Sequence, residues 1–416
     1  MENYPLIKRI LETNCPFVAF WFPWYWRKSD IAILRKIAGR WVWQNAKGTA
    51  AKLILILKVL LWPLIAVAGV LLAWLARNQV VSRLCEKGKW VQLREIVYFS
   101  FWRGFSPIDY YDKRIYLLQI SQVIDQFLGN MEINLLNIAI NSDQDYEIVN
   151  NKHRFAKRCI ELNIPAVSTI AAFSEGAIQD VDDPFSLPST DLYFKPVDGL
   201  RGRGIERWDF DSPKGTWKSE GTVLTEENLI KHFKETSKKE TFVLQEAAYN
   251  HKALENLSTG GLVTFRVMTV LGLEAETMKC YIVMPRGKTP ANHGTYGGIV
   301  ATVNLETNRI YRSFSRLPIL EKQPKHPETG GQIEGREFKE WPELEALALK
   351  AHKCFPEIFS IGWDLALTTK GPQIVEGNTQ WGAMAGFIIG RSSYPRRYLD
   401  VLHKAKEIGD PLGNLV

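Results

Sequence analysis

The sequence predicts an α+β fold of two or three lobes, preceded by a helical N-terminal region. Three observations support this prediction. Two apolar segments, 360–367 and 372–378, flank a Thr-Thr-Lys-Gly turn and have the pattern of a β-hairpin. Strands near 191–197 and 204–209 enclose a glycine-rich loop, and a further strand is expected near 241–247. The first hundred residues consist instead of long apolar and basic runs typical of helices.

The hairpin is expected to bring two carboxylates together. If its turn centres on Lys370, Asp364 lies six residues before the centre and Glu376 six after, so their Cβ atoms are about 5 Å apart. Asn378, two residues beyond Glu376, lies on the same face. Facing carboxylates repel unless a cation lies between them, and hard oxygen ligands suit magnesium that carries nucleotide phosphates. The alternative, an exposed hairpin with ordinary acidic side chains, is disfavoured by the apolar neighbours.

A phosphate-binding loop is predicted after the strand that ends at Lys195. Gly199, Gly202 and Gly204 follow within nine residues and would let backbone N–H groups approach phosphoryl oxygens. The loop is neither a Walker loop nor a dinucleotide fingerprint, because it lacks Gly-Lys-Ser/Thr and does not open a helix. Taken alone the loop is weak evidence, because glycine-rich hairpins are more often plain turns.

Three other segments carry side chains that fit the same site. Lys152 begins an amphipathic helix, where the helix dipole favours an anion such as phosphate nearby. The strand at 242–247 ends in Gln245 and Glu246, which could bind the edge of an adenine ring. Arg266 alternates with apolar residues along a strand, so its charge is expected either to point into the cleft or to form a structural salt bridge.

The order of these motifs resembles the ATP-grasp superfamily, whose fold has two α+β lobes that hold ATP between them. More narrowly, segments 104–111, 326–330 and 361–364 resemble the branch called sugar-transfer associated ATP-grasp. The resemblance covers about residues 100 to 400. It implies that ATP is bound by Lys152, Lys195, Gly199, Gly202, Gly204, Gln245 and Glu246. It implies that Asp364, Glu376 and Asn378 bind Mg²⁺, with two ions expected. It also implies that Lys195 and Arg266 are catalytic residues.

The resemblance also implies an ATP-dependent ligase. Such enzymes phosphorylate an oxygen of one substrate and let an amine displace the phosphate. The sharpest candidate is a mycosporine-glycine synthase-like reaction, with 4-deoxygadusol as acceptor and glycine as amine, and His293 and Tyr296 as substrate contacts. A second candidate is a membrane-bound ligase that adds an amino acid to a polysaccharide or lipid-linked sugar. A third is an ATP-binding membrane partner without ligase activity.

Composition narrows the class of protein. A chain of 416 residues with 46% hydrophobic and 23% charged residues can bury a large core. Five scattered cysteines without zinc spacing indicate free thiols in a reducing, cytoplasmic compartment. The net charge of +7 is concentrated in the first hundred residues, around an apolar run and an aromatic cluster, which favours a membrane surface over nucleic acid as partner.

The apolar run, residues 53–76, is long enough to cross a bilayer. Both of its flanks are basic, and Pro63 would allow a kink or a hairpin, so attachment to the inner face of a membrane is favoured over a single span or a buried helix.

The expected organisation has four parts: residues 1–100, a membrane-associating region; 101–148, a small module with a helix at 112–128 and a strand at 134–140; 149–405, the ATP-grasp domain; and 406–416, a tail. Within the third part, 190–247 with its helix near 225–237 would form the lobe over ATP, and a helix near 339–354 is expected after Trp341-Pro342.

Overall fold

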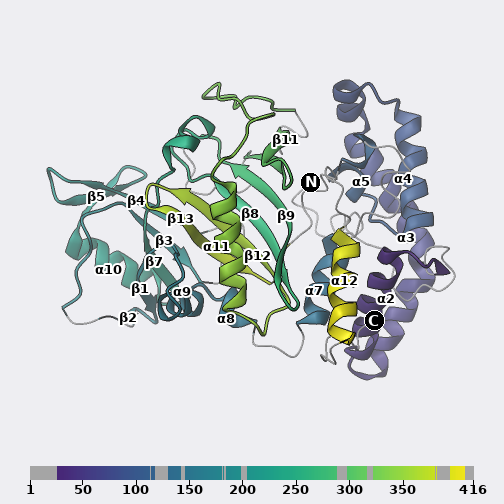
Figure 1. The fold of residues 1–416 in the computed structure, drawn as a ribbon, viewed down its shortest axis with the longest axis horizontal. Coiled ribbons are helices and arrows are strands. Elements are labelled where there is room, and N and C mark those ends of the chain that lie inside the picture. The colour runs from purple at the N-terminus through teal and green to yellow at the C-terminus, as the bar shows by residue number, and fades with distance from the viewer. Residues whose placement is uncertain are drawn as a thin grey trace.

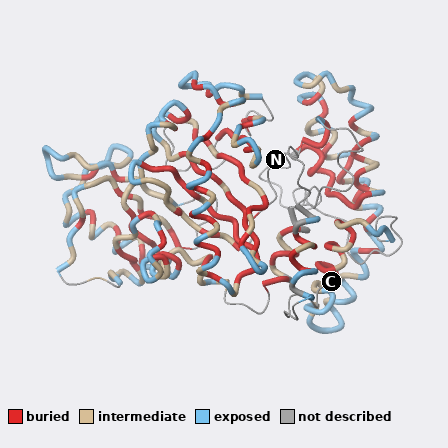
Figure 2. The backbone as a smooth tube through the Cα atoms, in the orientation of Figure 1, coloured by how far each residue is buried: buried red, intermediate tan, exposed pale blue. Residues whose placement is uncertain are grey.

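The structure, a computed structural model, describes residues 26–112, 114–117, 130–141, 146–179, 181, 184–197, 204–287, 298–315, 322–379, 381 and 394–407. Two antiparallel sheets form the centre of the molecule, and helices cover them (Figure 1). The buried residues follow the strands of both sheets (Figure 2).

The larger core belongs to a six-stranded sheet in the order β11-β10-β9-β8-β12-β13. Its strands are β8 (Thr264–Leu271), β9 (Ala275–Met284), β10 (Ile299–Asn304), β11 (Arg309–Ser315), β12 (Ser360–Thr368) and β13 (Gly371–Asn378). Helix α11 (Trp341–Lys353) crosses one face of this sheet (Figure 1), and its buried Leu344 and Ala348 pack with Phe265 and Leu365 of the strands. The α+β class is therefore confirmed.

The opposite face of this sheet packs against three helices that are far apart in the sequence. They are α2 (Asp30–Gln44), α7 (Asn130–Ile140) and α12 (Tyr394–Glu407), and they lie together in Figure 1. Leu34, Leu136 and Leu402 join Met268 of β8 and Tyr281 of β9 in one apolar cluster. The first hundred residues therefore contribute to the core of the sheet as well as to the N-terminal region.

The smaller sheet has seven strands in the order β2-β1-β7-β3-β4-β5-β6. They are β1 (Thr169–Ser174), β2 (Ala177–Gln179), β3 (Leu192–Pro196), β4 (Glu206–Asp211), β5 (Thr216–Ser219), β6 (Thr222–Thr225) and β7 (Phe242–Glu246). Helix α10 (Glu226–Thr236) covers it through Phe233, which stacks on Phe194 with ring centroids 4.2 Å apart. Helix α8 (Glu147–Asn150) contacts β13, while α9 (Lys152–Glu161) contacts both β1 and β13 and so connects the two sheets.

The N-terminal helices have a separate core. Helices α3 (Gly48–Cys85), α4 (Lys89–Arg103) and α5 (Asp109–Asp112), with the short η2 (Ile115–Leu117), surround an aromatic cluster. Within it Tyr110 donates a 2.6 Å hydrogen bond to Glu95, which also pairs with Lys87 at 2.6 Å. A further short helix, η3 (Lys252–Leu257), lies between β7 and β8 in the chain.

The elements expected around the glycine-rich loop are confirmed, as are α10 and α11, but the strand expected at 134–140 is wrong. These residues belong to the helix α7. Ile133, Leu136 and Ile140 are buried at spacings of three and four, which is a helical stripe. Asn137 is also buried and accepts a hydrogen bond from Tyr398, so a polar residue in the stripe hid the helical period.

Most of the helix expected at 112–128 lies outside the described residues. The expected boundaries at residues 100 and 405 fall inside α4 and α12.

Helix α3 is the longest element and carries the apolar run. It has 38 residues and continues through Pro63, so the kinked hairpin considered from the sequence is not formed. In its N-terminal half, leucines point to solvent, among them Leu60 at 61% exposure and Leu64 at 70%. Only 28% of its most apolar 18-residue stretch is buried, which excludes a helix hidden in the core. By length and composition it could cross a membrane.

Candidate active site between the two sheets

The β12–β13 hairpin pairs Asp364 directly with Glu376, as predicted, although the position of the turn and the regularity of the strands differ from the prediction. The turn pairs Thr368 with Gly371, so its centre lies half a residue before Lys370. A bulge between the Leu365–Ile374 and Asp364–Glu376 pairs then inserts one extra residue in β13. Because of this bulge Ile374 faces the core although Glu376, two residues later, faces the other side of the sheet with Asp364.

Two glycines of the hairpin fix where these carboxylates lie. A Cβ at Gly377 would come within 2.6 Å of Val149 and 3.2 Å of the Trp363 ring. A Cβ at Gly362 would lie 2.6 Å from Cβ of Trp381. The backbone on either side of the carboxylate pair is therefore in close contact with its surroundings and has room for no larger residue.

The carboxylates belong to a polar row that crosses four strands. Arg266 of β8 pairs with Asp364 on one side and with Tyr281 of β9 on the other, and Asp364 pairs in turn with Glu376. Directly opposed residues share a face, so these four side chains lie in line on one face. Arg266 Nη2 donates to Asp364 Oδ2 at 2.5 Å, and Nε contacts the other carboxylate oxygen. The salt bridge considered for Arg266 is thus formed, and its position in an ATP-binding cleft stays a prediction.

Burial and the neighbouring charges shift the pKa values of Asp364 and Glu376 in opposite directions. Burial raises the pKa of Asp364; Arg266 opposes the shift, and the facing Glu376 adds to it. Burial acts in the same direction on Glu376, but Lys152 and Arg266 and the hydrogen bond from Asp364 hold the pKa of Glu376 below its usual value. The pKa of Asp364 is thus raised and that of Glu376 lowered, as expected for two facing carboxyl groups in one buried site. Asn378 donates to Glu376 at 3.3 Å, so the third predicted metal ligand adjoins the pair.

Two lysines from other elements reach the same place. Lys152, the first residue of α9, donates to the carbonyl oxygen of Val197 at 2.8 Å, just after β3. Lys195, near the end of β3, donates to Gln245 Oε1 at 3.1 Å. Burial lowers the pKa of Lys195 to about 8; the charge of Glu376 opposes this shift and that of Lys152 adds to it. Electrostatic contact with Glu376 thus places both lysines at the carboxylate pair.

Gln245 and Glu246 lie at the end of β7, next to Lys195 across the sheet. Gln245 is 5% exposed and is held between Lys195 and the Thr169 hydroxyl, to which its Nε2 donates at 3.0 Å. Glu246 forms a 3.0 Å ion pair with Lys370 at the hairpin turn. This ion pair links the two sheets at the edge of the cleft.

Of the glycine-rich loop, only Gly204 is described. Its φ of +72° is a left-handed conformation that favours glycine. Gly199 and Gly202, together with the substrate candidates His293 and Tyr296, lie outside the described residues.

Some residues of the site were missed from the sequence. Tyr281, which completes the polar row, carries no motif, and its place is set by β8–β9 pairing. His326 was not missed, because the sequence made it a weaker candidate for contact with the second substrate. It is 1% exposed, and its Nε2 lies 3.1 Å from the carbonyl oxygen of Pro285. Glu328 accepts from the N–H of Gly287 at 2.9 Å, so this segment anchors the end of β9. A backbone role of this kind leaves no signal in a single sequence.

The donor set for a metal consists of two carboxylates and one amide. Within the described ranges no group of three or more His, Cys, Asp and Glu side chains gathers, so a zinc-type or acidic-cage centre is absent there. Two hard carboxylates and an amide oxygen, with room left for phosphate oxygens, fit Mg²⁺ better than any softer metal.

Two antiparallel sheets that enclose three cationic and two acidic side chains are the arrangement expected of the ATP-grasp class of enzymes, which are ATP-dependent ligases. Residues 133–398 match the family model described as sugar-transfer associated ATP-grasp. The chain belongs to this family. The predicted resemblance is therefore confirmed at the level of superfamily and branch.

Solved structures of the same superfamily are similar to the chain only remotely. D-alanyl-alanine synthetase A from Vibrio cholerae is 13% identical, with 69% of this chain and 71% of that chain covered and a TM-score of 0.34. Biotin carboxylase from Campylobacter jejuni, in complex with β,γ-ATP, is 11% identical, with 70% and 52% covered and a TM-score of 0.36. At these scores the likeness carries no argument about substrates. The comparison with curated proteins gave no match.

Proposed function

We propose that the cleft between the two sheets binds ATP and catalyses carbon–nitrogen bond formation through a phosphorylated intermediate. The observation that carries this proposal is the meeting of Lys152 and Lys195 with the Arg266–Asp364–Glu376 row. These residues come from five elements of both sheets and the helix between them. Three cationic side chains here meet two carboxyl groups, so the cations outnumber the acids, and this excess suits a triphosphate.

Magnesium would be held by Asp364, Glu376 and Asn378, with Glu376 central to any pair of ions. When bound, it would neutralise charge on the β- and γ-phosphates. Two carboxyl groups and an amide oxygen side by side are hard oxygen donors of the kind that Mg²⁺ prefers, which is the physical reason to expect one. Whether one or two ions bind is a question for direct titration.

The chain's own residues then position the reactants. Lys152 and Lys195 would bind phosphate oxygens, with the 199–204 loop closing over them, and Gln245 with Glu246 would bind the adenine edge. Arg266 would turn from Asp364 to the γ-phosphate. The acceptor oxygen attacks the γ-phosphorus, the bond to ADP breaks, and an amine then attacks the activated carbon and releases phosphate. The amine proton leaves to solvent or to a base in the cleft.

Two pairs of substrates are candidates. The first is 4-deoxygadusol with glycine, a mycosporine-glycine synthase-like reaction that depends on the family resemblance, with His293 and Tyr296 as contacts. The second is a polysaccharide or lipid-linked sugar with an amino acid. The exposed apolar helix α3 and the family description favour the second. A binding partner without ligase activity is disfavoured because the set Asp364, Glu376 and Asn378 is complete.

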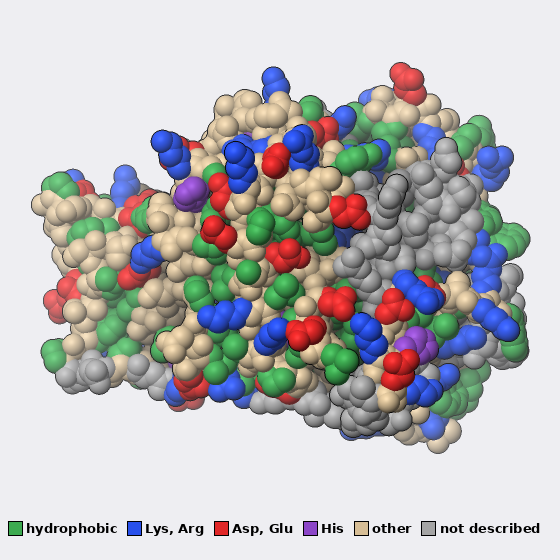
Figure 3. All heavy atoms as spheres, viewed as in Figure 1, with side chains coloured by type: hydrophobic (Ala, Val, Ile, Leu, Met, Phe, Trp, Pro, Cys, Tyr) green, Lys and Arg blue, Asp and Glu red, His purple; other side chains and the backbone are tan. Residues whose placement is uncertain are grey.

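We further propose that α3 attaches the protein to the cytoplasmic face of a membrane. Hydrophobic side chains of the N-terminal helices, mixed with Lys and Arg, form the right-hand edge of Figure 3. Trp43, near the end of α2, is 37% exposed, and Lys52 in the first turns of α3 lies 5.5 Å above its ring; aromatic and basic side chains of this kind suit a membrane interface.

The test is phosphate release from ATP that depends on an added amino acid pool, followed by mass spectrometry of the products. We expect Glu376→Gln and Asp364→Asn to lower turnover by about a hundredfold or more, since each removes a metal ligand. Glu343→Gln, an exposed position on α11, is the matched control and should keep full activity. Wild-type turnover in Glu376→Gln would refute the assignment, and release of phosphate without any amino acid dependence would refute the ligase.

A further inference from the structure

The outward sides of α3 and α4 carry two apolar stripes that meet at one point. The exposed side chains on α3 recur at spacings of three and four residues, which places them on one side of the helix: Leu53, Leu57, Leu60, Leu64, Val67, Leu71 and Leu75. On α4, Trp90, Val91 and Trp102 are 75%, 39% and 52% exposed. Trp74 of α3 joins the stripes, because its ring centroid lies 5.7 Å from that of Trp90 and its Nε1 donates to the carbonyl oxygen of Lys89 at 2.9 Å.

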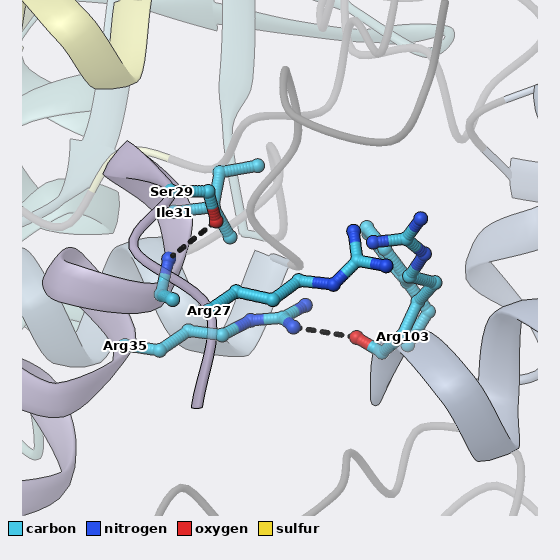
Figure 4. Close-up of a pocket in the computed structure, with 7 residues that line it drawn as sticks. Arg27, Ser29, Ile31, Arg35 and Arg103 are labelled. Atoms are coloured by element: carbon cyan, nitrogen blue, oxygen red, sulfur yellow. Dashed lines mark hydrogen bonds between the residues drawn. The ribbon is translucent and has the colours of Figure 1, made fainter. Parts of the chain in front are cut away.

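The helices at both ends of α3 belong to the same body. Helix α2 ends three residues before α3 begins and packs against the six-stranded sheet, and α4 follows α3 after three residues and packs along it. Arg35 of α2 donates to the carbonyl oxygen of Arg103 at the end of α4 (Figure 4). Helix α4, with 15 residues and a length of about 22 Å, is too short to bring the chain back across a hydrocarbon core of about 30 Å. Both ends of α3 are therefore held on one side of any bilayer.

The charges beside the two stripes are almost all positive. Within residues 48–103, all of which the structure describes, the exposed basic side chains are Lys52, Lys58, Arg83, Lys89 and Arg94, and the one exposed acidic side chain is Glu86. The buried Glu95 pairs with Lys87 at 2.6 Å and is thus neutralised within the fold. Cations mixed with exposed leucine and tryptophan side chains complement a membrane surface that contains anionic lipids.

We propose, building on the attachment of α3 proposed above, that α3 and α4 together lie in the plane of an anionic membrane surface and that α3 does not cross the bilayer. The two stripes would enter the headgroup region side by side, with the basic side chains at the lipid phosphates. The first turns of α3 also expose Ile54, Ile56 and Leu61 on either side of the stripe. This apolar arc is wider than the face that one partner helix covers, which favours lipid over a second copy of the chain as the occupant.

Flotation of the full chain with vesicles of phosphatidylcholine and phosphatidylglycerol tests the joint surface. Trp90→Ser with Trp102→Ser removes the two most exposed hydrophobic side chains of α4, and we expect vesicle affinity to fall about tenfold or more. Val223→Ser with Tyr311→Ser is the matched control, since both residues are exposed on strands outside the N-terminal helices, and it should bind as the wild type does. Vesicles of phosphatidylcholine alone should bind the wild type about tenfold more weakly.

The result separates this proposal from the attachment of α3 itself. If Leu57→Asp with Leu64→Asp abolishes flotation but the α4 variant floats as the wild type does, attachment through α3 stands and the joint surface is wrong. A stable dimer in sedimentation velocity that does not float with vesicles would show that a second copy covers the stripe, and it would also overturn the proposal. None of these measurements depends on ligase activity.

Labelling of two native lysines tests whether α3 crosses the bilayer. Lys47 and Lys89 are exposed just outside the two ends of α3. Inside-out membrane vesicles from cells that produce the full chain are treated with a membrane-impermeant amine reagent, and the modified lysines are identified by mass spectrometry. We expect both lysines to be modified while the vesicles are sealed. Modification of either one only after detergent has opened the vesicles would mean that α3 spans the membrane, and the proposed in-plane position would be wrong.

Discussion

Among single residues, Lys195 has the environment that responds most directly to pH. It is half-buried, it donates to Gln245, and its pKa is lowered to about 8 by burial. A lysine with an ordinary pKa would stay charged throughout the range in which enzymes are assayed. In this site the charge on one proposed phosphate ligand is therefore lost as pH rises through about 8.

We predict that nucleotide affinity falls above pH 8. Below this pH Lys195 is protonated and can pair with a phosphate oxygen; above it the lysine is neutral and that charge-assisted contact is lost. The loss should be about tenfold between pH 7 and pH 9.5. Fluorescence titration with a labelled ATP analogue in the presence of Mg²⁺ measures it.

Lys195→Arg is the control for this prediction, because arginine stays charged over the whole range. Its affinity should depend on pH much less than that of the wild type. Should both proteins show the same pH profile, the titrating group is another one and the role given to Lys195 is wrong.

At the scale of elements, the β12–β13 hairpin shows what the sequence could and could not predict. Alternation and the turn residues predicted the two strands and the opposed carboxylates. The bulge that aligns Asp364 with Glu376 was not predictable, because an extra residue in one strand has no signature in the pattern of apolar residues. Two small errors, in the centre of the turn and in the regularity of the strand, cancelled. For α7 the short apolar run was interpreted as a strand, and packing of these residues against α2 and β8 makes it a helix instead.

Gly377→Ala tests the close packing behind the carboxylate pair. The added methyl would overlap Val149 and press on Trp363, both in the core, so β13 must shift. We expect a loss of about 1–3 kcal/mol in the free energy of unfolding, measured by denaturant titration. Phosphate release should fall as well, because Glu376 adjoins the displaced residue.

Gly88→Ala adds the same methyl group where the nearest atom is 3.8 Å away, and it should leave both stability and turnover unchanged. Equal stability of the two variants would show that the backbone of β13 can move without cost.

For the whole molecule, the helical N-terminal region has two roles that the sequence did not separate. Helix α2 packs against the six-stranded sheet through Ile31, Leu34 and Ile37, whereas the first half of α3 exposes its leucines. The apolar and basic composition predicted membrane contact for the region as a whole. Contacts between α2 and the sheet join residues hundreds of positions apart, and no local pattern encodes such pairings.

The membrane proposal predicts that a double variant, Leu57→Asp with Leu64→Asp, loses vesicle binding. These residues are 53% and 70% exposed on α3, and a carboxylate at the depth of an apolar helix costs about 3 kcal/mol each. The two costs together correspond to a loss of affinity of about ten thousandfold, so co-sedimentation with vesicles should be abolished.

Leu273→Asp is the matched control, since Leu273 is 65% exposed in the β8–β9 turn, outside the N-terminal helices. Undiminished sedimentation of the double variant would place the membrane contact elsewhere.

The ion pair between Arg266 and Asp364 affects the order in which the metal and the nucleotide can bind. Because the Arg266 guanidinium pairs with both carboxylate oxygens of Asp364, a lone magnesium ion would have to compete with this buried cation for an oxygen ligand. A nucleotide that already carries Mg²⁺ would bring phosphate oxygens to pair with Arg266 at the same time as the ion binds Asp364. Neither Arg266 nor Asp364 would then lose its partner of opposite charge. The proposed roles of these two side chains therefore predict that metal and nucleotide load as one complex.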